Sequence, residues 1–425
     1  MDLISETTEK VSGKVTPSPS KFYTQFASAI SLLTDGKNII NSPLLVDDTR
    51  ELVKALEDMG GTSKRSKKKW SIWGIGKKPK PSGQEVDSKK SLMSMSLLTS
   101  LSALASRIMV VTGKKKVRSR NALSLINGLK KLGVDVHSTK SDETPPLIIF
   151  DSEICGGEIS LDNDMNPKYL PPILLLTPYP EEGVEFELAP QFDNYITEMA
   201  LQLMEKSGIG IEKEENQLMI NHGEYETIEI TPPLDMFSIL PFVIGSVITG
   251  GELKIPKLEE VVNREEFLSL MDRIGLRFEN LDGEITLPEN QELEARKYSL
   301  RNFPEILPFF AVLACFADGK THIRDAERAR NMKSDQISTI CEALEKMGAD
   351  IEEKEDGLII KGPAELEGAK VNGRKDDSIV AALGTAGLGA EGKTIIKNRA
   401  ETLRESYPHF VSTFKDLGAE IGYSR

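Results

Sequence analysis

One pattern of hydrophobic and polar positions recurs six times along this chain of 425 residues. An amphipathic helical segment ends in a hydrophobic residue and a glycine, and an alternating strand follows, as in LEKMGADI and FKDLGAEI. A glycine just after the last helical turn adopts the left-handed C-cap conformation, and alternating residues after it form a half-buried strand. The copies recur at intervals of about 70 residues, a period typical of repeated supersecondary units. The glycines that end the six helices are Gly60, Gly133, Gly208, Gly275, Gly348 and Gly418.

A second phrase precedes most of these helices and predicts a glycine turn that opens another strand. It reads TDGKNI in its first copy and AEGKTII in its last. Each repeat therefore contains at least two strands and two helices. Six repeats divide into two groups of three, which predicts an α/β fold of two pseudo-symmetric domains facing each other across a cleft. The turn glycines are Gly36, Gly183, Gly251, Gly319 and Gly392.

Two proline-rich connectors indicate where the chain passes between the domains. TPSPSKFYTQF lies near the N-terminus and ITPPLDMFS lies between the third and fourth repeats, and proline and serine at this density indicate extended connectors. If both are crossings, one domain spans residues 20–231 and the other combines residues 1–19 with 232–425. A cleft between domains is the usual ligand site, so we expect Lys21 and Asp235 at its mouth.

Composition narrows the class of protein further. With 39% hydrophobic and 28% charged residues, the chain is predicted to be a soluble globular protein, with no signal peptide and hence a cytoplasmic location. A net charge of −13 argues against polyanion binding. Three cysteines without a CxxC spacing predict neither a disulfide framework nor a zinc site, and we expect them to be buried hydrophobic residues. We further expect a monomer without cofactor, metal or membrane contact.

The segment SKRSKKKWSIWGIGKKPKPSG, residues 63–83, is the strongly basic exception. It contains two tryptophans and no acidic residue, a combination that could hold phosphates and stack on bases. The alternative, which we favour, is a solvated hairpin whose lysines protect its edge.

Several further phrases resemble the 5-enolpyruvylshikimate-3-phosphate synthase family. PSPSKFYTQF looks like the family's N-terminal lysine motif, and AERARNMKSDQ, KDDSIVAALGTAGLGAEGKT and ESYPHF are similar to its later motifs. These enzymes transfer a carboxyvinyl group from phosphoenolpyruvate to shikimate 3-phosphate. The resemblance covers nearly the whole chain and implies the family's fold. It also implies a site with many cations for two phosphates and two carboxylates, and with an acid and a base.

At these motifs, however, the chain departs from the family's functional residues. The resemblance places amides, hydroxyls, apolar groups or opposite charges where the family has cations, acid/base residues or substrate-binding polar residues. Asn302 stands at the general base, and an amide cannot accept that proton at neutral pH. The other substituted positions are Phe22, Phe26, Leu92, Ser96, Asn166, Pro167, Lys168, Lys333, Gln336, Asp377, Ser378 and Glu405.

The resemblance leaves a set of candidate ligand-binding residues that includes both cations and carboxylates. No catalytic residue can be named among them. Some members match the family, with Asp47, Glu327, Arg328 and Arg330 as further matches, and others are substitutions. Acidic members could equally cap helices or pair with nearby lysines. The candidates for binding a ligand are Lys21, Asp48, Arg120, Lys168, Asp235, Asn302, Lys333, Asp376 and Asp377.

Three functional hypotheses follow. The first is a homologue whose transferase activity has been lost or redirected to a less anionic small molecule. The second is an active carboxyvinyl transferase with a rearranged site, for which no replacement acid or base is visible. The third is a non-catalytic regulatory or partner-binding protein. Residues alone do not separate the first from the third.

Overall fold

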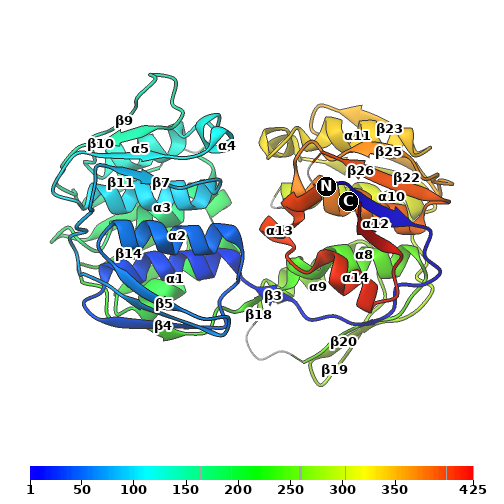
Figure 1. Ribbon diagram of the computed structural model, residues 1–425, viewed down its shortest axis with the longest axis horizontal. Coiled ribbons are helices and arrows are strands. Elements are labelled where there is room, and N and C mark those ends of the chain that lie inside the picture. Colours follow the sequence, from blue (N-terminus) through cyan, green and yellow to red (C-terminus); the bar gives the residue numbers. More distant parts are fainter. Residues whose placement is uncertain (162–164, 193, 258–260, 302, 399, 425) are drawn as a thin grey trace. The chain divides into compact units, whose positions relative to one another are not determined.

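The computed structural model describes residues 1–161, 165–192, 194–257, 261–301, 303–398 and 400–424. Contacts within the chain divide it into two compact units (Figure 1). The continuous unit comprises Pro19–Pro233, drawn from blue to green. The discontinuous unit combines Met1–Ser18 with Leu234–Arg425, so its first strands come from the opposite end of the chain.

The described residues of each unit form three four-stranded sheets, and all six sheets have one topology. An edge strand pairs in parallel with the second strand, the second pairs antiparallel with the third, and the third pairs antiparallel with the other edge strand. The orders are β15-β4-β6-β5, β7-β8-β10-β9 and β11-β12-β14-β13 in the continuous unit. They are β25-β26-β1-β27, β2-β17-β20-β19 and β21-β22-β24-β23 in the discontinuous unit. The repeat predicted from the hydrophobic pattern is therefore confirmed.

The strands are short, with two to six residues each. Those of the continuous unit are β4 (Lys37–Asn41), β5 (Thr62–Arg65), β6 (Lys69–Trp73), β7 (Glu85–Asp87), β8 (Met109–Thr112), β9 (Val136–Ser138), β10 (Leu147–Ile149), β11 (Gly157–Ser160), β12 (Val184–Glu187), β13 (Ile211–Glu214), β14 (Gln217–Ile220) and β15 (Glu229–Ile230). Those of the sheets of the discontinuous unit are β1 (Leu3–Glu6), β2 (Gly13–Lys14), β17 (Leu253–Ile255), β19 (Glu279–Leu281), β20 (Glu284–Leu287), β21 (Lys297–Ser299), β22 (Gly319–Arg324), β23 (Asp350–Lys354), β24 (Gly357–Gly362), β25 (Lys370–Asn372), β26 (Lys393–Lys397) and β27 (Ile421–Tyr423). Near the boundaries lie β3 (Ser18–Pro19), β16 (Leu234–Asp235) and β18 (Val261–Val262).

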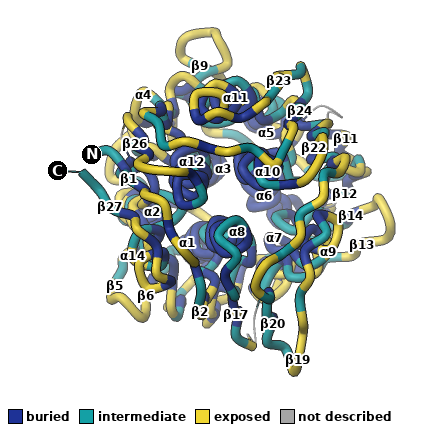
Figure 2. The backbone as a smooth tube through the Cα atoms, turned by 90° about the vertical axis from the view of Figure 1, so that its right-hand side faces the viewer, coloured by how far each residue is buried: buried dark blue, intermediate teal, exposed yellow. Residues whose placement is uncertain are grey.

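Every repeat supplies one helix that is buried along most of its length. In the discontinuous unit three such helices, α8, α10 and α12, contact one another and carry the colour of buried residues along much of their length in Figure 2. Because they are enclosed on nearly all sides, their sequences are apolar or small, as in LPFFAVLACF. The buried helices are α1 (Lys21–Leu33), α3 (Leu92–Ala103), α6 (Leu170–Leu174), α8 (Leu240–Ile248), α10 (Leu307–Phe316) and α12 (Asp377–Gly389).

The second helix of each repeat is amphipathic and ends at a predicted glycine. All six of these glycines have positive φ, from 79° at Gly133 to 107° at Gly60, which confirms the C-cap prediction. The predicted glycine turn around Gly251 is present and opens β17, and within it Gly250 has the positive φ of 69°. A Cβ on Gly251 would lie 2.1 Å from the Val11 carbonyl oxygen, so this glycine allows close packing instead. These helices are α2 (Asp47–Asp58), α5 (Leu123–Lys131), α7 (Tyr195–Lys206), α9 (Arg264–Arg273), α11 (Gln336–Lys346) and α14 (Phe410–Asp416).

The basic segment forms a hairpin, as expected, and its two tryptophans differ in environment. Strands β5 and β6 pair antiparallel, with Thr62 opposite Trp73. The Trp70 side chain is 1% exposed and belongs to the core, so it has no face available for a base. The Lys37 ammonium lies over the Trp73 ring, 5.6 Å from its centroid.

The cysteines differ from the prediction at one position. Cys315 and Cys341 are buried, but Cys155 is exposed, so the expectation of burial is wrong for it. It lies between β10 and β11, outside the buried helices. In the part of the chain that the structure describes, no helix is both long enough and apolar enough to cross a membrane.

Candidate functional site

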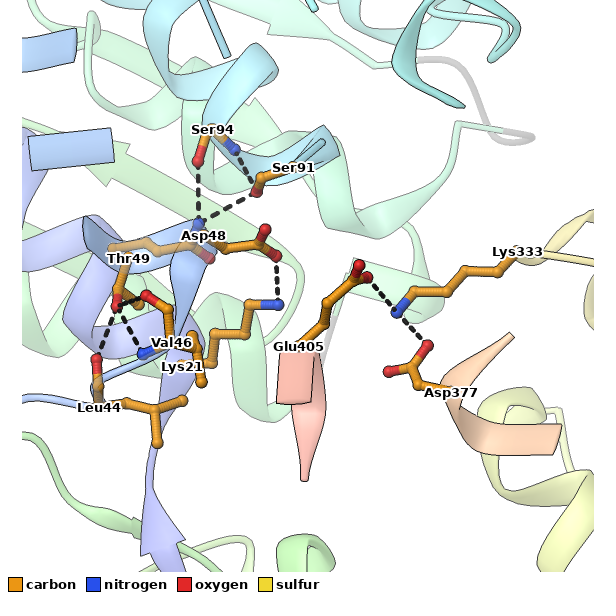
Figure 3. A network of polar contacts seen from close by, with 11 residues as sticks. Lys21, Leu44, Val46, Asp48, Thr49, Ser91, Ser94, Lys333, Asp377 and Glu405 are labelled. Carbon is orange, nitrogen blue, oxygen red and sulfur yellow. Dashed lines mark hydrogen bonds and ion pairs between the residues drawn. The ribbon is translucent and has the colours of Figure 1, made fainter. Parts of the chain in front are cut away.

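In the continuous unit, Lys21 lies at the start of α1 and forms an ion pair with a neighbouring helix. Ser20 caps α1 by accepting a hydrogen bond from the Tyr23 amide. The Lys21 ammonium lies 2.5 Å from a carboxylate oxygen of Asp48, in the first turn of α2 (Figure 3). Two candidates from separate motifs are thus brought together, and the charge of Lys21 is balanced within its own unit.

A set of neutral polar side chains links α1 to the start of α3 in the same unit. The buried Gln25 amide donates hydrogen bonds to the hydroxyls of Ser91, at 3.2 Å, and Ser94, at 3.0 Å. Ser91 also caps α3 through the Ser94 amide, at 3.1 Å. Sequence reasoning missed all three residues, although Ser91 before a helical segment is an N-cap signal.

Two positions where the resemblance places arginines hold buried, uncharged side chains. Phe26 is fully buried and stacks on Phe22, with 5.4 Å between ring centroids. Ser96 is 2% exposed, and its hydroxyl donates to the Leu92 carbonyl oxygen at 3.0 Å. Both side chains pack inside the continuous unit. Because phenylalanine and serine are uncharged, neither position supplies the cation of an arginine.

The candidates Arg120 and Lys168 both lie close to Tyr169, the first through its charge and the second as the preceding residue of the chain. The positive charge of Arg120 acts on Tyr169, although burial has the larger effect and raises the pKa of that phenol. Lys168 precedes Tyr169 in the short helix η1 (Pro167–Tyr169), which Asn166 caps by accepting from the Lys168 amide at 3.1 Å. Of these two cations, Arg120 is therefore the one whose charge acts on the phenol.

In the discontinuous unit, Asp376 lies buried at the N-terminus of α12. Its carboxylate accepts hydrogen bonds from the Ser378 amide at 3.1 Å, the Ser334 hydroxyl at 2.9 Å and the Gln336 amide group at 3.1 Å. Burial, and then the neighbouring carboxylate of Asp377, raise the pKa of Asp376. The alternative that Asp376 caps a helix is therefore confirmed.

Lys333 lies between two carboxylates of the same unit (Figure 3). It pairs with Asp377, whose side chain is only 2% exposed, and lies 3.7 Å from Glu405 in α13 (Leu403–Ser406). Burial opposes the charge of its ammonium, but Asp377, Glu405 and Asp376 outweigh this and raise the pKa of Lys333. The cation introduced at this position is thus matched by acidic residues of the chain itself.

Asp235 caps the short helix η3 (Met236–Ile239). Its carboxylate accepts from the Phe237 amide and from the side-chain amide of Asn263, both at 2.9 Å. Burial raises the pKa of Asp235. The negative charges of Asp377, Asp235 and Asp376 all act on Tyr407, whose pKa is raised first by burial and then by these carboxylates. Tyr407 therefore lies near all three carboxylates, and sequence reasoning missed it.

Several further substituted or matching positions of this unit also make internal contacts. Arg330 bonds to Asp335 at 3.0 Å and Glu353 at 2.8 Å. Gln336 is 2% exposed, and its carbonyl oxygen has no hydrogen-bond partner among the described residues. The Ser378 side chain is bonded to Tyr407. Among the residues that the structure describes, no three His, Cys, Asp or Glu side chains converge as metal ligands. Asn302 lies outside the described residues.

Six sheets of one topology, three in each unit, define a class of two-unit α/β proteins built from threefold repeats. The family model for EPSP synthase (3-phosphoshikimate 1-carboxyvinyltransferase) matches residues 5–414. The chain belongs to this family, as the resemblance of its motifs predicted.

Individual relatives agree with the family match. A 3-phosphoshikimate 1-carboxyvinyltransferase of Methanocaldococcus jannaschii is 30% identical over 99% of both chains. One of Halobacterium salinarum is 29% identical over 97% of both chains. A solved structure of EPSP synthase from Acinetobacter baumannii superimposes with a TM-score of 0.84 at 22% identity, covering all of both chains. This likeness confirms the predicted fold class.

Proposed function

We propose that this member of the EPSP synthase family binds a hydroxyl-rich small molecule, less anionic than a phosphorylated one, and does not carry out the carboxyvinyl transfer named for its relatives. The observation that carries the proposal is the environment of Lys333, paired with Asp377 and 3.7 Å from Glu405. Three acidic side chains, including Asp376, surround this one ammonium. Carboxylates that outnumber cations repel a phosphate dianion.

The surviving cations and the substituted positions support the same proposal. Lys21 is balanced by Asp48 at 2.5 Å, and Arg330 by Asp335 and Glu353. Losing one buried partner of a charged ligand costs about 2–5 kcal/mol, and the resemblance implies the loss of several. An acid or base contributes a factor of about 10²–10⁴ in rate.

The class of ligand follows from the groups that remain. Carboxylates accept hydrogen bonds from hydroxyls or ammonium groups, and the amide oxygen of Gln336 lacks a partner among the described residues. A neutral cyclic polyol supplies such donors without charge repulsion. We therefore expect unphosphorylated cyclitols, or cyclitols with an amino group, to bind at Asp377 and Glu405.

A thermal-shift screen followed by calorimetry tests the ligand class. The panel contains cyclitols, aminocyclitols, shikimate, shikimate 3-phosphate and phosphoenolpyruvate. We expect an uncharged or cationic cyclitol to raise Tm, and Glu405→Gln to weaken that binding about tenfold. Glu345→Gln, on the exposed side of α11, is the control. Micromolar binding of either phosphorylated compound whose affinity Glu405→Gln changes, and which therefore occurs at this site, would contradict the proposal.

A phosphate-release assay with both phosphorylated substrates tests the lost transfer, with an archaeal relative as the positive control. We expect no turnover by this chain. Rates of about 1–10³ per second, typical of enzymes, would instead support a rearranged active transferase. If no small molecule binds, the regulatory or partner-binding hypothesis replaces the proposal.

A further inference from the structure

A cavity of about 570 Å³ lies in the continuous unit, beside the ends of β7 and β8 and the short helix α4 (Lys115–Arg118). We call it the basic cavity, because cations outnumber acids on its wall. Its charged lining residues are Lys114, Lys115, Arg118, Lys140, Glu85 and Asp87.

The backbone after β8 holds the first two lysines at the cavity. Gly113 packs so closely that a Cβ there would lie 2.8 Å from the Ser88 hydroxyl and 2.9 Å from the Lys89 carbonyl oxygen. The Lys114 amide then donates to that Lys89 carbonyl at 2.6 Å. Because this turn is fixed to the segment that follows β7, Lys114 and Lys115 project from a rigid part of the wall.

Arg118 is oriented by one of its nitrogens. Its Nε donates to the Thr112 hydroxyl at 3.1 Å, and no hydrogen bond joins its two terminal nitrogens to another described residue. These two nitrogens form the planar fork that binds phosphate or carboxylate through two parallel hydrogen bonds. Lys140 approaches from another segment and donates to the Arg118 carbonyl oxygen at 3.3 Å.

The acidic residues of the wall leave this positive charge in excess. Asp87 is already engaged by Lys89, whose ammonium lies at 2.9 Å and whose amide donates to it at 2.8 Å. Glu85 is therefore the carboxylate that remains to face four cations. A dianion in the cavity would be attracted by several charges at once.

We propose that the basic cavity binds the phosphate group of a small molecule. Its volume lies within the range of about 300–1,000 Å³ typical of ligand pockets, and its cations combine an arginine fork with lysine point charges. A nucleic acid would need an extended basic surface to follow its backbone, whereas these charges gather around one open pocket. The inference does not rest on the proposed function, since it uses other residues.

Calorimetry at low ionic strength tests the site with inorganic phosphate, glycerol 3-phosphate and an oligonucleotide. We expect saturable binding of one equivalent of phosphate or phosphomonoester, and the two probes distinguish free phosphate from an ester. The double variant Lys114→Gln and Lys115→Gln should bind at least about tenfold more weakly, while Lys130→Gln with Lys206→Gln, equal in charge change, should stay within about twofold.

Arg118→Lys keeps the charge but removes the fork, and we expect about a tenfold weaker affinity with an unchanged Tm. If the double variant fails to fold, Arg118→Lys alone tests the proposed phosphate site. The proposal is overturned if neither phosphate probe saturates below about 10 mM, if both double variants lose binding equally, or if only the oligonucleotide binds.

Discussion

At the scale of single residues, the ion pair between Lys333 and Asp377 leads to a testable prediction. The Asp377 side chain is 2% exposed and that of Lys333 is 29% exposed. The carboxylate is therefore the more deeply buried partner, and it would be left buried without this cation if the lysine were removed. Removing one partner of a buried pair leaves an uncompensated charge, and the cost exceeds the net value of the intact pair.

We therefore expect Lys333→Met to lower the free energy of unfolding by about 2–3 kcal/mol. The matched control is Lys346→Met, which removes an exposed pair with Glu342 and should cost under about 1 kcal/mol. Urea denaturation at pH 7 measures both. Combining Lys333→Met with Asp377→Asn should recover part of the loss, and equal effects of the two lysine variants would contradict the buried pairing.

Asp376 makes a prediction about pH, because burial beside Asp377 raises its pKa above the ordinary value of 3.8. A carboxyl that binds its proton more tightly in the folded state stabilises the fold below the unfolded pKa. That stability is lost as pH rises through the folded pKa. Asp376→Asn removes this dependence, so the variant should gain on the parent protein as pH rises above about 4.

Denaturation at several pH values within this window provides the measurement. Asp142, which is exposed and has a lowered pKa, supplies the comparison, since Asp142→Asn should lose relative to the parent as pH rises from about 2 to 5. A stability difference between Asp376→Asn and the parent that is independent of pH would rule out this account.

At the scale of elements, the helix-ending glycines carry the repeat. Gly348 follows α11 with φ of +96°, and a Cβ there would lie 3.3 Å from the Glu365 carbonyl oxygen. A side chain in the left-handed region costs about 1–2 kcal/mol. The turn into β23 therefore depends on the absence of a side chain at this position.

Gly348→Ala should lower the free energy of unfolding by about 1–2 kcal/mol, which a drop in Tm would report. Gly422, in β27, has an ordinary φ and open space around the site of its missing Cβ. Gly422→Ala should therefore be neutral or slightly stabilising, by under about 1 kcal/mol. If the two variants behave alike, left-handed conformation is not what requires glycine at Gly348.

At the scale of the whole molecule, the discontinuous unit depends on the first residues of the chain. β1 lies between β26 and β27 in its sheet, with Leu3 opposite both Ile396 and Tyr423. β2 is the parallel edge partner of β17. Without these two strands, two sheets of the unit are incomplete and interior backbone groups lose their hydrogen bonds.

We expect residues 234–425 alone to be unfolded or aggregated. Residues 1–18 joined by a short flexible linker to residues 234–425 should fold cooperatively, and so should residues 19–233 alone. Circular dichroism and urea denaturation of the three proteins test this. Cooperative folding of residues 234–425 without the N-terminal strands would refute the dependence on β1 and β2.

Local sequence determined the repeated elements of this protein. A helix that ends in glycine, and an alternating strand after it, depend on backbone conformation and neighbouring side chains within a few residues. All six helix-ending glycines and the hairpin of β5 and β6 could therefore be predicted, and the motifs identified the family. Local sequence did not reveal the close approach of Gly251 to the Val11 backbone, which lies far away in sequence.

Only the tertiary structure decided which charges meet and which side chains are buried. Lys333 pairs with Asp377, 44 residues away, and Trp70 enters the core although its segment is the most basic of the chain. Cys155 lies at the surface, and Lys140 joins the cations of residues 114–118 on the wall of one cavity. Such contacts join distant segments, and their energies depend on burial and distance rather than on neighbouring residues. For that reason, the candidate residues could be named from the sequence, while their partners could not.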